Sequence, residues 1–97
     1  EKLELFGLPA IKKEDACYLT NGKLAGSILS LDKAVRNMKE WCNLSYIDLM
    51  KISSKNPAKA VHLQNLGEIH EGYLADLVLL DDNLNVINVF KNGKLVK

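Results

Sequence analysis

The sequence is poor in the side chains from which metal sites and nucleophile sites are built. Its 97 residues include two histidines and two cysteines, with no H-x-H, H-E-x-x-H or C-x-x-C spacing. A zinc hydrolase site needs three or four His, Asp, Glu or Cys ligands brought together. His62 and His70 lie on different expected elements, so we expect each to be structural or solvent-exposed. The chain is therefore expected to hold no metal ligand and no catalytic residue.

Other catalytic patterns are missing too. Ser27 lacks the G-x-S-x-G context of a nucleophile, and the glycine patterns of nucleotide binding are absent. Residues 81–83 read Asp-Asp-Asn, which is more typical of a turn than of paired carboxylates. Cys17 and Cys42 are too few for a disulfide framework. Buried free thiols are expected, with a bridge or a reactive thiol left open.

Strong net charge and long apolar runs are also lacking. The formal net charge of +1 gives no electrostatic case for nucleic acid or an anionic membrane as partner. The apolar run 77–80 is far shorter than the roughly 20 residues that span a bilayer. Residues 1–4 carry charges where a signal peptide would be apolar, so we expect a cytoplasmic protein. Because the first residue is Glu1 and not Met, we expect the chain to be part of a longer product.

The first third alternates short apolar runs with turns, which predicts a meander of two or three strands. Asn21-Gly22 predicts a two-residue turn. We expect a loop at Leu24-Ala25-Gly26-Ser27, where glycine would let backbone amides approach a ligand just before a helix N-terminus. A loop shaped only to enter the helix is the alternative.

A helix is predicted after Ser30, its expected N-cap, and Asn43 is the expected stop. Its apolar residues share one face at helical spacing: Leu31, Ala34, Val35, Met38, Trp41 and Cys42. Were the Trp41 ring fully buried there, Trp41→Ala would cost about 3–5 kcal/mol.

Two further helices are predicted. One begins at Ser45, with Asp48 three residues later in a capping-box arrangement. A separate short helix is expected to begin at Asn56 as N-cap with Pro57 in its first turn, and to end near His62.

From Gly67 onward the pattern predicts strands over 77–80, 86–90 and 94–96, the last two joined by an Asn92-Gly93 turn. So small a hairpin is not stable alone in water. We therefore expect it to pair with strands from elsewhere.

Five motifs in this order resemble the C-terminal portion of amidohydrolases. They are Asn21-Gly22, Leu24–Ser27, Val35-Arg36-Asn37, Asn56–Ala60 and Gly67–Asp76. The last is shared across the superfamily, whereas the Leu-Ala-Gly-Ser segment followed by Val-Arg-Asn most resembles the N-acetylglucosamine-6-phosphate deacetylase family.

The resemblance implies an α/β fold, a (β/α)₈ barrel with a small β-sandwich. Residues 1–66 would be the C-terminal part of the barrel, and residues 67–97 the C-terminal strands of the sandwich. The remaining sandwich strands would come from an N-terminal segment.

The resemblance also implies an activity, the hydrolysis of N-acetylglucosamine 6-phosphate to glucosamine 6-phosphate and acetate. It implies a divalent metal, zinc or iron, in the full-length enzyme and none bound by this chain. The family's catalytic Asp would lie upstream, so the chain alone would be inactive. Substrate contacts would fall on Leu24, Ala25 and Gly26, and the full-length enzyme would be a homodimer.

Two other interpretations stay open. One is an amidohydrolase with a different amide substrate. The other is a non-catalytic oligomerisation module that protects its edge strands by pairing with a second copy.

Overall fold

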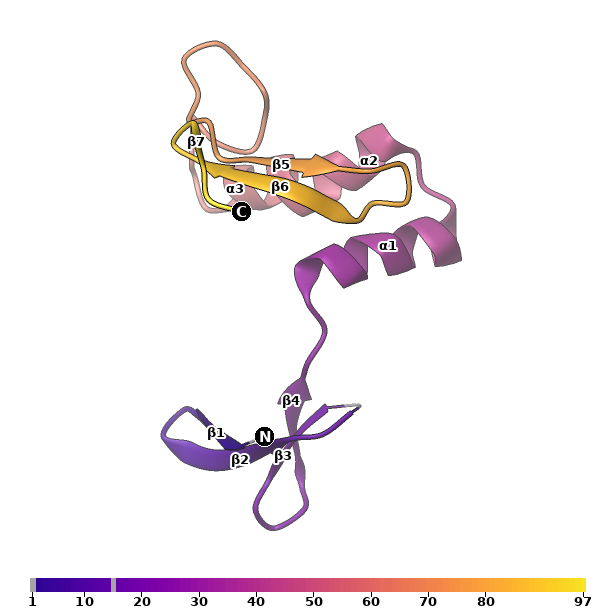
Figure 1. The fold of residues 1–97 in the computed structure, drawn as a ribbon, viewed down its shortest axis with the longest axis vertical. Coiled ribbons are helices and arrows are strands. Elements are labelled where there is room, and N and C mark those ends of the chain that lie inside the picture. Colours follow the sequence, from indigo (N-terminus) through magenta and orange to yellow (C-terminus); the bar gives the residue numbers. More distant parts are fainter. Residues whose placement is uncertain (1, 15) are drawn as a thin grey trace. The chain divides into compact units, whose positions relative to one another are not determined.

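The computed structural model describes residues 2–14 and 16–97, which combine short strands and helices (Figure 1). The chain divides into two compact units, Glu1–Ser30 and Leu31–Lys97. Among the described residues, no helix is both long and apolar enough to cross a membrane.

The first unit is a four-stranded antiparallel sheet in which each strand pairs with the next one along the chain. Its strands are β1 (Lys2–Leu5), β2 (Leu8–Lys12), β3 (Ala16–Leu19) and β4 (Leu24–Ser27). Among the described residues of this unit, Ala10, Ala16 and Cys17 are buried. The predicted meander is confirmed with more strands than expected, and Cys17 is a buried free thiol as predicted.

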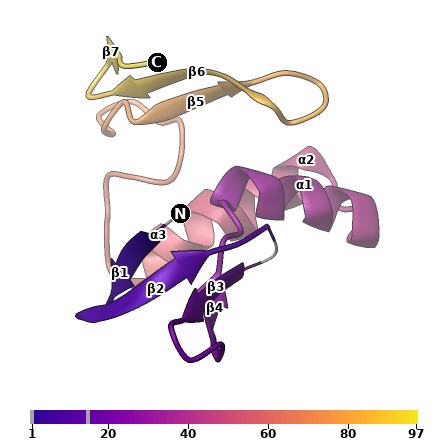
Figure 2. The same ribbon diagram turned by 60° about the horizontal axis from the view of Figure 1, so that its bottom comes forward.

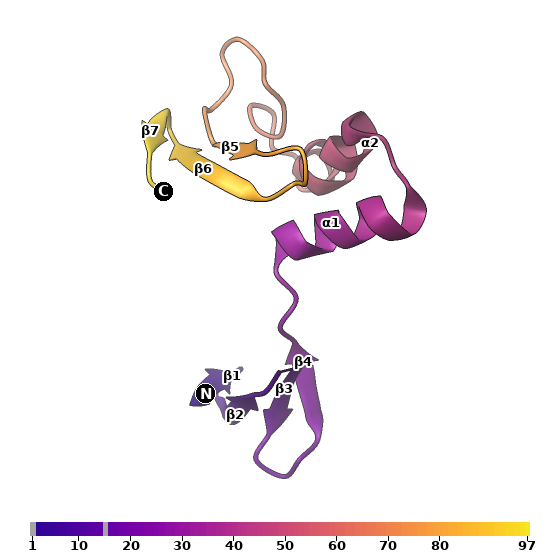
Figure 3. The ribbon, with the colours of Figure 1, turned by 45° about the vertical axis from the view of Figure 1, so that its right-hand side comes forward.

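The turn between β3 and β4 (Figure 3) is longer than the two-residue turn that was predicted. The Leu19 N–H donates to the Lys23 carbonyl at 2.8 Å, and the Gly22 N–H donates to the Leu19 carbonyl at 2.9 Å. Gly22 has a φ of 84°, the left-handed residue that closes a three-residue hairpin loop. Asn21 instead uses its side chain, because its Oδ1 accepts the Lys23 N–H at 3.0 Å.

The second unit begins with the predicted helix α1 (Leu31–Cys42). Asn43 follows it with a φ of 50° and donates its N–H to the Lys39 carbonyl at 3.0 Å, which confirms the expected stop. The expected burial of the apolar face is wrong, since no residue of α1 is buried. Trp41 is 72% exposed and Cys42 is exposed, because nothing in the described unit packs over that end of the helix. The large cost of Trp41→Ala therefore does not apply to this chain.

Residues 46–60 form one continuous helical stretch: α2 (Tyr46–Met50), a π-helical turn η1 (Lys51–Lys55) and α3 (Asn56–Ala60). The predicted cap is confirmed, because Ser45 Oγ accepts the Asp48 N–H at 3.1 Å.

Helix α3 begins at Asn56 with Pro57 in its first turn, as predicted, but the predicted N-cap role of Asn56 is wrong because the helical stretch does not break before it. Asn56 has helical dihedral angles and donates its N–H to the Lys51 carbonyl, five residues back. The cause is Pro57, which has no N–H and whose ring would clash with a carbonyl one α-turn earlier. A wider π-turn relieves that conflict without ending the helix.

The helical stretch ends in a left-handed residue, His62, with a φ of 63°. The Leu63 N–H donates to the Ala58 carbonyl at 2.9 Å, and the His62 N–H donates to the Lys59 carbonyl at 3.1 Å. This pair of bonds is a Schellman motif. The predicted end near His62 is confirmed.

His62→Gly is expected to stabilise the protein by about 1 kcal/mol, because glycine adopts the left-handed conformation without the cost that a Cβ atom brings. The measurement is the free energy of urea unfolding. Ala60→Gly, two residues earlier in a helical conformation, is the matched control and should destabilise by about 1 kcal/mol. Equal destabilisation by both variants would contradict the capping role.

The chain ends in a three-stranded antiparallel sheet of order β5-β6-β7 (Figure 2). The strands are β5 (Leu77–Leu80), β6 (Val86–Lys91) and β7 (Lys94–Leu95). Backbone bonding continues past β7, since the Val96 N–H donates to the Val89 carbonyl at 2.8 Å. The predicted strands are confirmed. No strand of the described residues pairs with the outer edge of β5.

The motif Gly67–Asp76, which precedes β5, makes hydrogen bonds to the turn between β6 and β7. Asp76 Oδ1 accepts the Asn92 N–H at 2.9 Å, and the Ala75 carbonyl accepts the Gly93 N–H at 2.9 Å. Asn92 and Gly93 both have positive φ, as the predicted two-residue turn requires. The Ala-Asp end of the motif therefore fixes the β6–β7 turn.

Candidate functional site

The candidate substrate segment Leu24-Ala25-Gly26 lies in strand β4. The prediction of a loop at this segment is therefore wrong. Tyr18 faces Leu24 and Cys17 faces Gly26 across the β3–β4 ladder. Ala25 is therefore the extra residue of a β-bulge. A bulge bends its strand and redirects its backbone and side chains.

The segment is open to a ligand on one side. β4 is the last strand of its sheet, and an edge strand presents unpaired N–H and C=O groups. Leu24 is 69% exposed, and a Cβ atom built on Gly26 would meet no described atom within 4 Å. An edge backbone with little side-chain bulk can offer hydrogen bonds to a polar ligand at close range. All three candidate residues share this edge.

Ser27, the last residue of β4, has a structural partner. Its Oγ accepts the Leu29 N–H at 2.9 Å, a local turn that begins the connection to α1.

The two described histidines lie in different parts of the chain and do not form a metal site. His62 lies at the end of α3, whereas the His70 ring stacks on Tyr73 with 5.1 Å between ring centres. His70 is in the predicted turn before Gly72, because its carbonyl accepts the Tyr73 N–H at 3.0 Å. In the described parts of the chain, 2–14 and 16–97, no group of three His, Cys, Asp or Glu residues could hold a metal ion.

The acidic run 81–83 is a turn, as predicted. Asp81 Oδ1 accepts the N–H groups of Asn83 and Asn85, each at 2.9 Å, and Asp81 Oδ2 accepts from the Asn85 amide at 3.2 Å. Hydrogen bonding from Asn85 lowers the pKa of Asp81 below its ordinary 3.8. A carboxylate held in its charged form by backbone donors is suited to organising a loop rather than to proton transfer.

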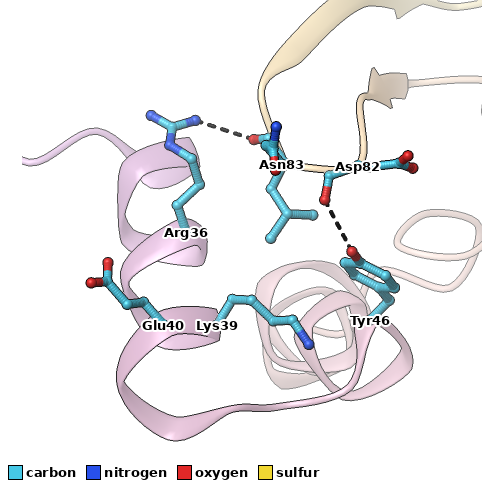
Figure 4. A pocket seen from close by; sticks show the side chains of 7 residues that line it. Arg36, Lys39, Glu40, Tyr46, Asp82 and Asn83 are labelled. Atoms are coloured by element: carbon cyan, nitrogen blue, oxygen red, sulfur yellow. Dashed lines mark hydrogen bonds between the residues drawn. The ribbon is translucent and has the colours of Figure 1, made fainter.

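A hollow of about 250 Å³ lies between α1, α2 and the 81–85 loop (Figure 4). Several of its polar side chains bond to backbone carbonyls: the Tyr46 hydroxyl donates to the Asp82 carbonyl at 3.0 Å, and Arg36 Nη1 donates to the Leu84 carbonyl at 3.2 Å. Lys39 Nζ donates to the Leu44 carbonyl at 2.8 Å. The sequence analysis did not predict this cluster. The Val-Arg-Asn motif around Arg36 was the one feature that could have pointed to it.

Comparison with known proteins gives consistent matches. The model of the Amidohydrolase family matches residues 14–96. The N-acetylglucosamine-6-phosphate deacetylase of Lysinibacillus sphaericus is 44% identical over 82 residues, which are 84% of this chain and 21% of that protein. The N-acetylgalactosamine-6-phosphate deacetylase of a Shewanella strain is 37% identical over 76 residues, 78% of this chain and 19% of that protein.

A solved structure agrees with these relatives. The crystal structure of N-acetylglucosamine-6-phosphate deacetylase from Thermotoga maritima superposes with a TM-score of 0.83 at 38% identity, covering 98% of this chain and 26% of that one. The chain thus spans about a fifth to a quarter of the length of the proteins it matches.

Proposed function

The chain belongs to the amidohydrolase family, and on that premise we propose that it is part of an N-acetylglucosamine-6-phosphate deacetylase. The proposed reaction hydrolyses N-acetylglucosamine 6-phosphate to glucosamine 6-phosphate and acetate. The observation that carries the proposal is the 44% identity to a deacetylase of that name over 84% of the chain. The non-catalytic oligomerisation module is disfavoured by the family match over residues 14–96.

The proposed architecture assigns residues 1–66 to the end of a (β/α)₈ barrel and residues 67–97 to strands of a small β-sandwich. The open outer edge of β5 supports the second assignment, because a three-stranded sheet with an unpaired edge has room for further strands.

Leu24, Ala25 and Gly26 are the proposed substrate contacts, made through their backbone. The bulge at Ala25 and the open space at Gly26 support this role. Backbone N–H groups at a fixed edge orient a polar substrate without the entropy cost of ordering long side chains.

Metal chemistry is assigned to other segments of the enzyme. Amidohydrolases generally depend on a divalent metal, which polarises the amide carbonyl and activates water. The described residues of this chain do not fit such a site, since no group of three His, Cys, Asp or Glu residues among them could hold a metal ion. We therefore place the metal ligands and the catalytic Asp outside this chain, with zinc or iron as the metal. A homodimer and a cytoplasmic location stay predictions.

The test is acetate release from N-acetylglucosamine 6-phosphate by a complete enzyme, in which this chain replaces the matched segment of the Lysinibacillus sphaericus relative. The expected result is metal-dependent turnover, with the parent enzyme as the matched control. A folded, metal-loaded hybrid that releases no acetate would refute the proposal.

N-acetylgalactosamine 6-phosphate is the second candidate substrate, favoured by the 37% identity to the Shewanella relative. Assaying both sugar phosphates at equal concentration decides between them. The ratio of the two kcat/KM values measures the preference.

A further inference from the structure

Only two of the chain's asparagines precede glycine, Asn21 and Asn92, and both are exposed. In such a pair the glycine nitrogen can attack the carbonyl of the asparagine side chain, because the glycine has no side chain to hinder the approach. Both glycine N–H groups donate to a backbone carbonyl at 2.9 Å. That feature does not distinguish the two pairs, so their other contacts decide which one reacts.

The side chain of Asn21 is activated by a contact within its own loop, the one between β3 and β4 (Figure 3). The Lys23 N–H donates to Asn21 Oδ1 at 3.0 Å. Attack on the side-chain carbonyl places negative charge on that oxygen, and an N–H donor already in position stabilises the charge. The bond also folds the side chain back along residues 22–23, the direction in which the ring must close.

The second pair lies beside a carboxylate instead. Asp76 Oδ1 accepts the Asn92 N–H at 2.9 Å, so a negative charge lies close to the reacting groups. Loss of the Gly93 proton and growth of charge on the Asn92 oxygen both add negative charge there, and a nearby like charge disfavours both steps. Asn21 has a donor at the developing charge, whereas Asn92 has an anion near it, so Asn21 is the more reactive.

We propose that Asn21 is a site of spontaneous deamidation and becomes mainly isoaspartate. The Gly22 nitrogen loses its proton and bonds to Asn21 Cγ. The bond from Cγ to the side-chain nitrogen breaks, and that nitrogen takes up the proton and leaves as ammonia. Water then opens the cyclic imide, at the former main-chain carbonyl to give isoaspartate or at Cγ to give aspartate. Each conversion therefore consumes one water and releases one ammonia.

Isoaspartate at position 21 lengthens the main chain of the hairpin loop by one atom. Strand β4 begins directly after this loop, at Leu24. The loop of a hairpin fixes the register of its two strands, and here that register pairs Leu24 with Tyr18 and Gly26 with Cys17. The extra atom displaces these pairs and with them the backbone edge that is proposed to meet the substrate. This consequence rests on the proposed function, whereas the deamidation itself does not.

Peptide mapping by mass spectrometry tests the modification without any activity assay. The complete hybrid enzyme is incubated at mildly alkaline pH and sampled over time, and isoaspartate is told from aspartate by labelling with an isoaspartate methyltransferase. Asn21 is expected to deamidate about tenfold faster than Asn92, a modest effect because a donor in solvent stabilises charge less than one in a closed site. Equal rates at the two positions, or a faster reaction at Asn92, would overturn the proposal.

The effect on substrate binding is measured on the same samples. The isoaspartate form is expected to have a KM for N-acetylglucosamine 6-phosphate about tenfold above that of fresh enzyme. Asn21→Asp is the matched control, because it has the charge of the product, keeps the length of the main chain and still offers Lys23 an acceptor. Its KM should stay within about twofold of the parent, before and after incubation.

Repair separates the altered main chain from general damage. The methyltransferase with S-adenosylmethionine converts isoaspartate to aspartate, so it should restore the original KM. An unchanged KM once isoaspartate has formed, or an equally raised KM in fresh Asn21→Asp, would overturn the explanation by main-chain length. If the fresh hybrid has no turnover but Asn21 still deamidates first, the proposed function fails while the modification site stands.

Discussion

Gly26→Val in the complete enzyme is expected to raise KM for N-acetylglucosamine 6-phosphate about 30- to 100-fold, equivalent to about 2–3 kcal/mol of lost binding. The valine side chain would fill the space at the β4 edge where the substrate is proposed to meet the backbone. The sheet itself should tolerate the change, because no described atom lies within 4 Å of a Cβ atom at Gly26 and valine is a strong strand former. The measurement is a full Michaelis curve.

Thr20→Val is the matched control for this prediction. Thr20 lies in the hairpin loop between β3 and β4 and is exposed, so this variant places a valine in the same hairpin away from the proposed contact. Its KM should stay within about twofold. A folded Gly26→Val enzyme whose KM is within threefold of the parent would remove Leu24–Gly26 from the substrate site.

Gly67→Ala is expected to destabilise the protein by about 2–5 kcal/mol. Gly67 has a φ of 95°, and a Cβ atom there would lie 2.9 Å from both the Ala58 Cβ and the Ser54 carbonyl oxygen. The backbone passes directly against η1 and α3, so the substitution adds a steric clash to an unfavourable conformation. Urea unfolding of the complete enzyme measures the loss.

Gly72→Ala separates the two causes. Gly72 has a similar φ of 87°, but no atom of the described residues lies within 4 Å of an added Cβ, so only the conformational cost of about 1–2 kcal/mol applies. If both variants lose the same stability, the close approach of Gly67 to the helical stretch is not the reason for that glycine.

The sequence predicted those elements whose signals are local. Ser45 caps its helix and Asn92-Gly93 makes its turn because each depends on residues within one turn of chain. The spacing of its apolar residues predicts helix α1, but the same spacing does not predict whether those residues are buried. Trp41 is exposed because burial needs a partner surface. A periodic pattern shows that such a surface is expected, but it does not show which segment provides it.

The errors in the fold share a physical cause. Pro57 is typical of a helix start, yet here the preceding helix widens into a π-turn and continues. Leu24–Ser27 has the glycine of a loop, yet pairing with β3 makes it a strand with a bulge. In both cases the hydrogen bonds of neighbouring segments outweigh local preference.

The candidate site was predicted only as far as the family resemblance reached. Leu24, Ala25 and Gly26 were identified by motif, and the structure adds that they share an open strand edge. The bond from Arg36 to the Leu84 carbonyl joins residues 48 positions apart, and no local pattern encodes such a contact. Contacts of this range follow from the fold, so they become visible only when the loop and the helix are placed together.

The most direct test of the account measures acetate release and bound metal side by side for the 97-residue chain and for the complete hybrid enzyme, each supplied with zinc or iron(II). We predict turnover of N-acetylglucosamine 6-phosphate and stoichiometric metal in the hybrid, and neither in the chain alone. Acetate release by the chain alone, or stoichiometric metal bound through His62 or His70, would contradict the claim that this chain supplies the substrate edge and scaffold while other segments supply the reacting groups.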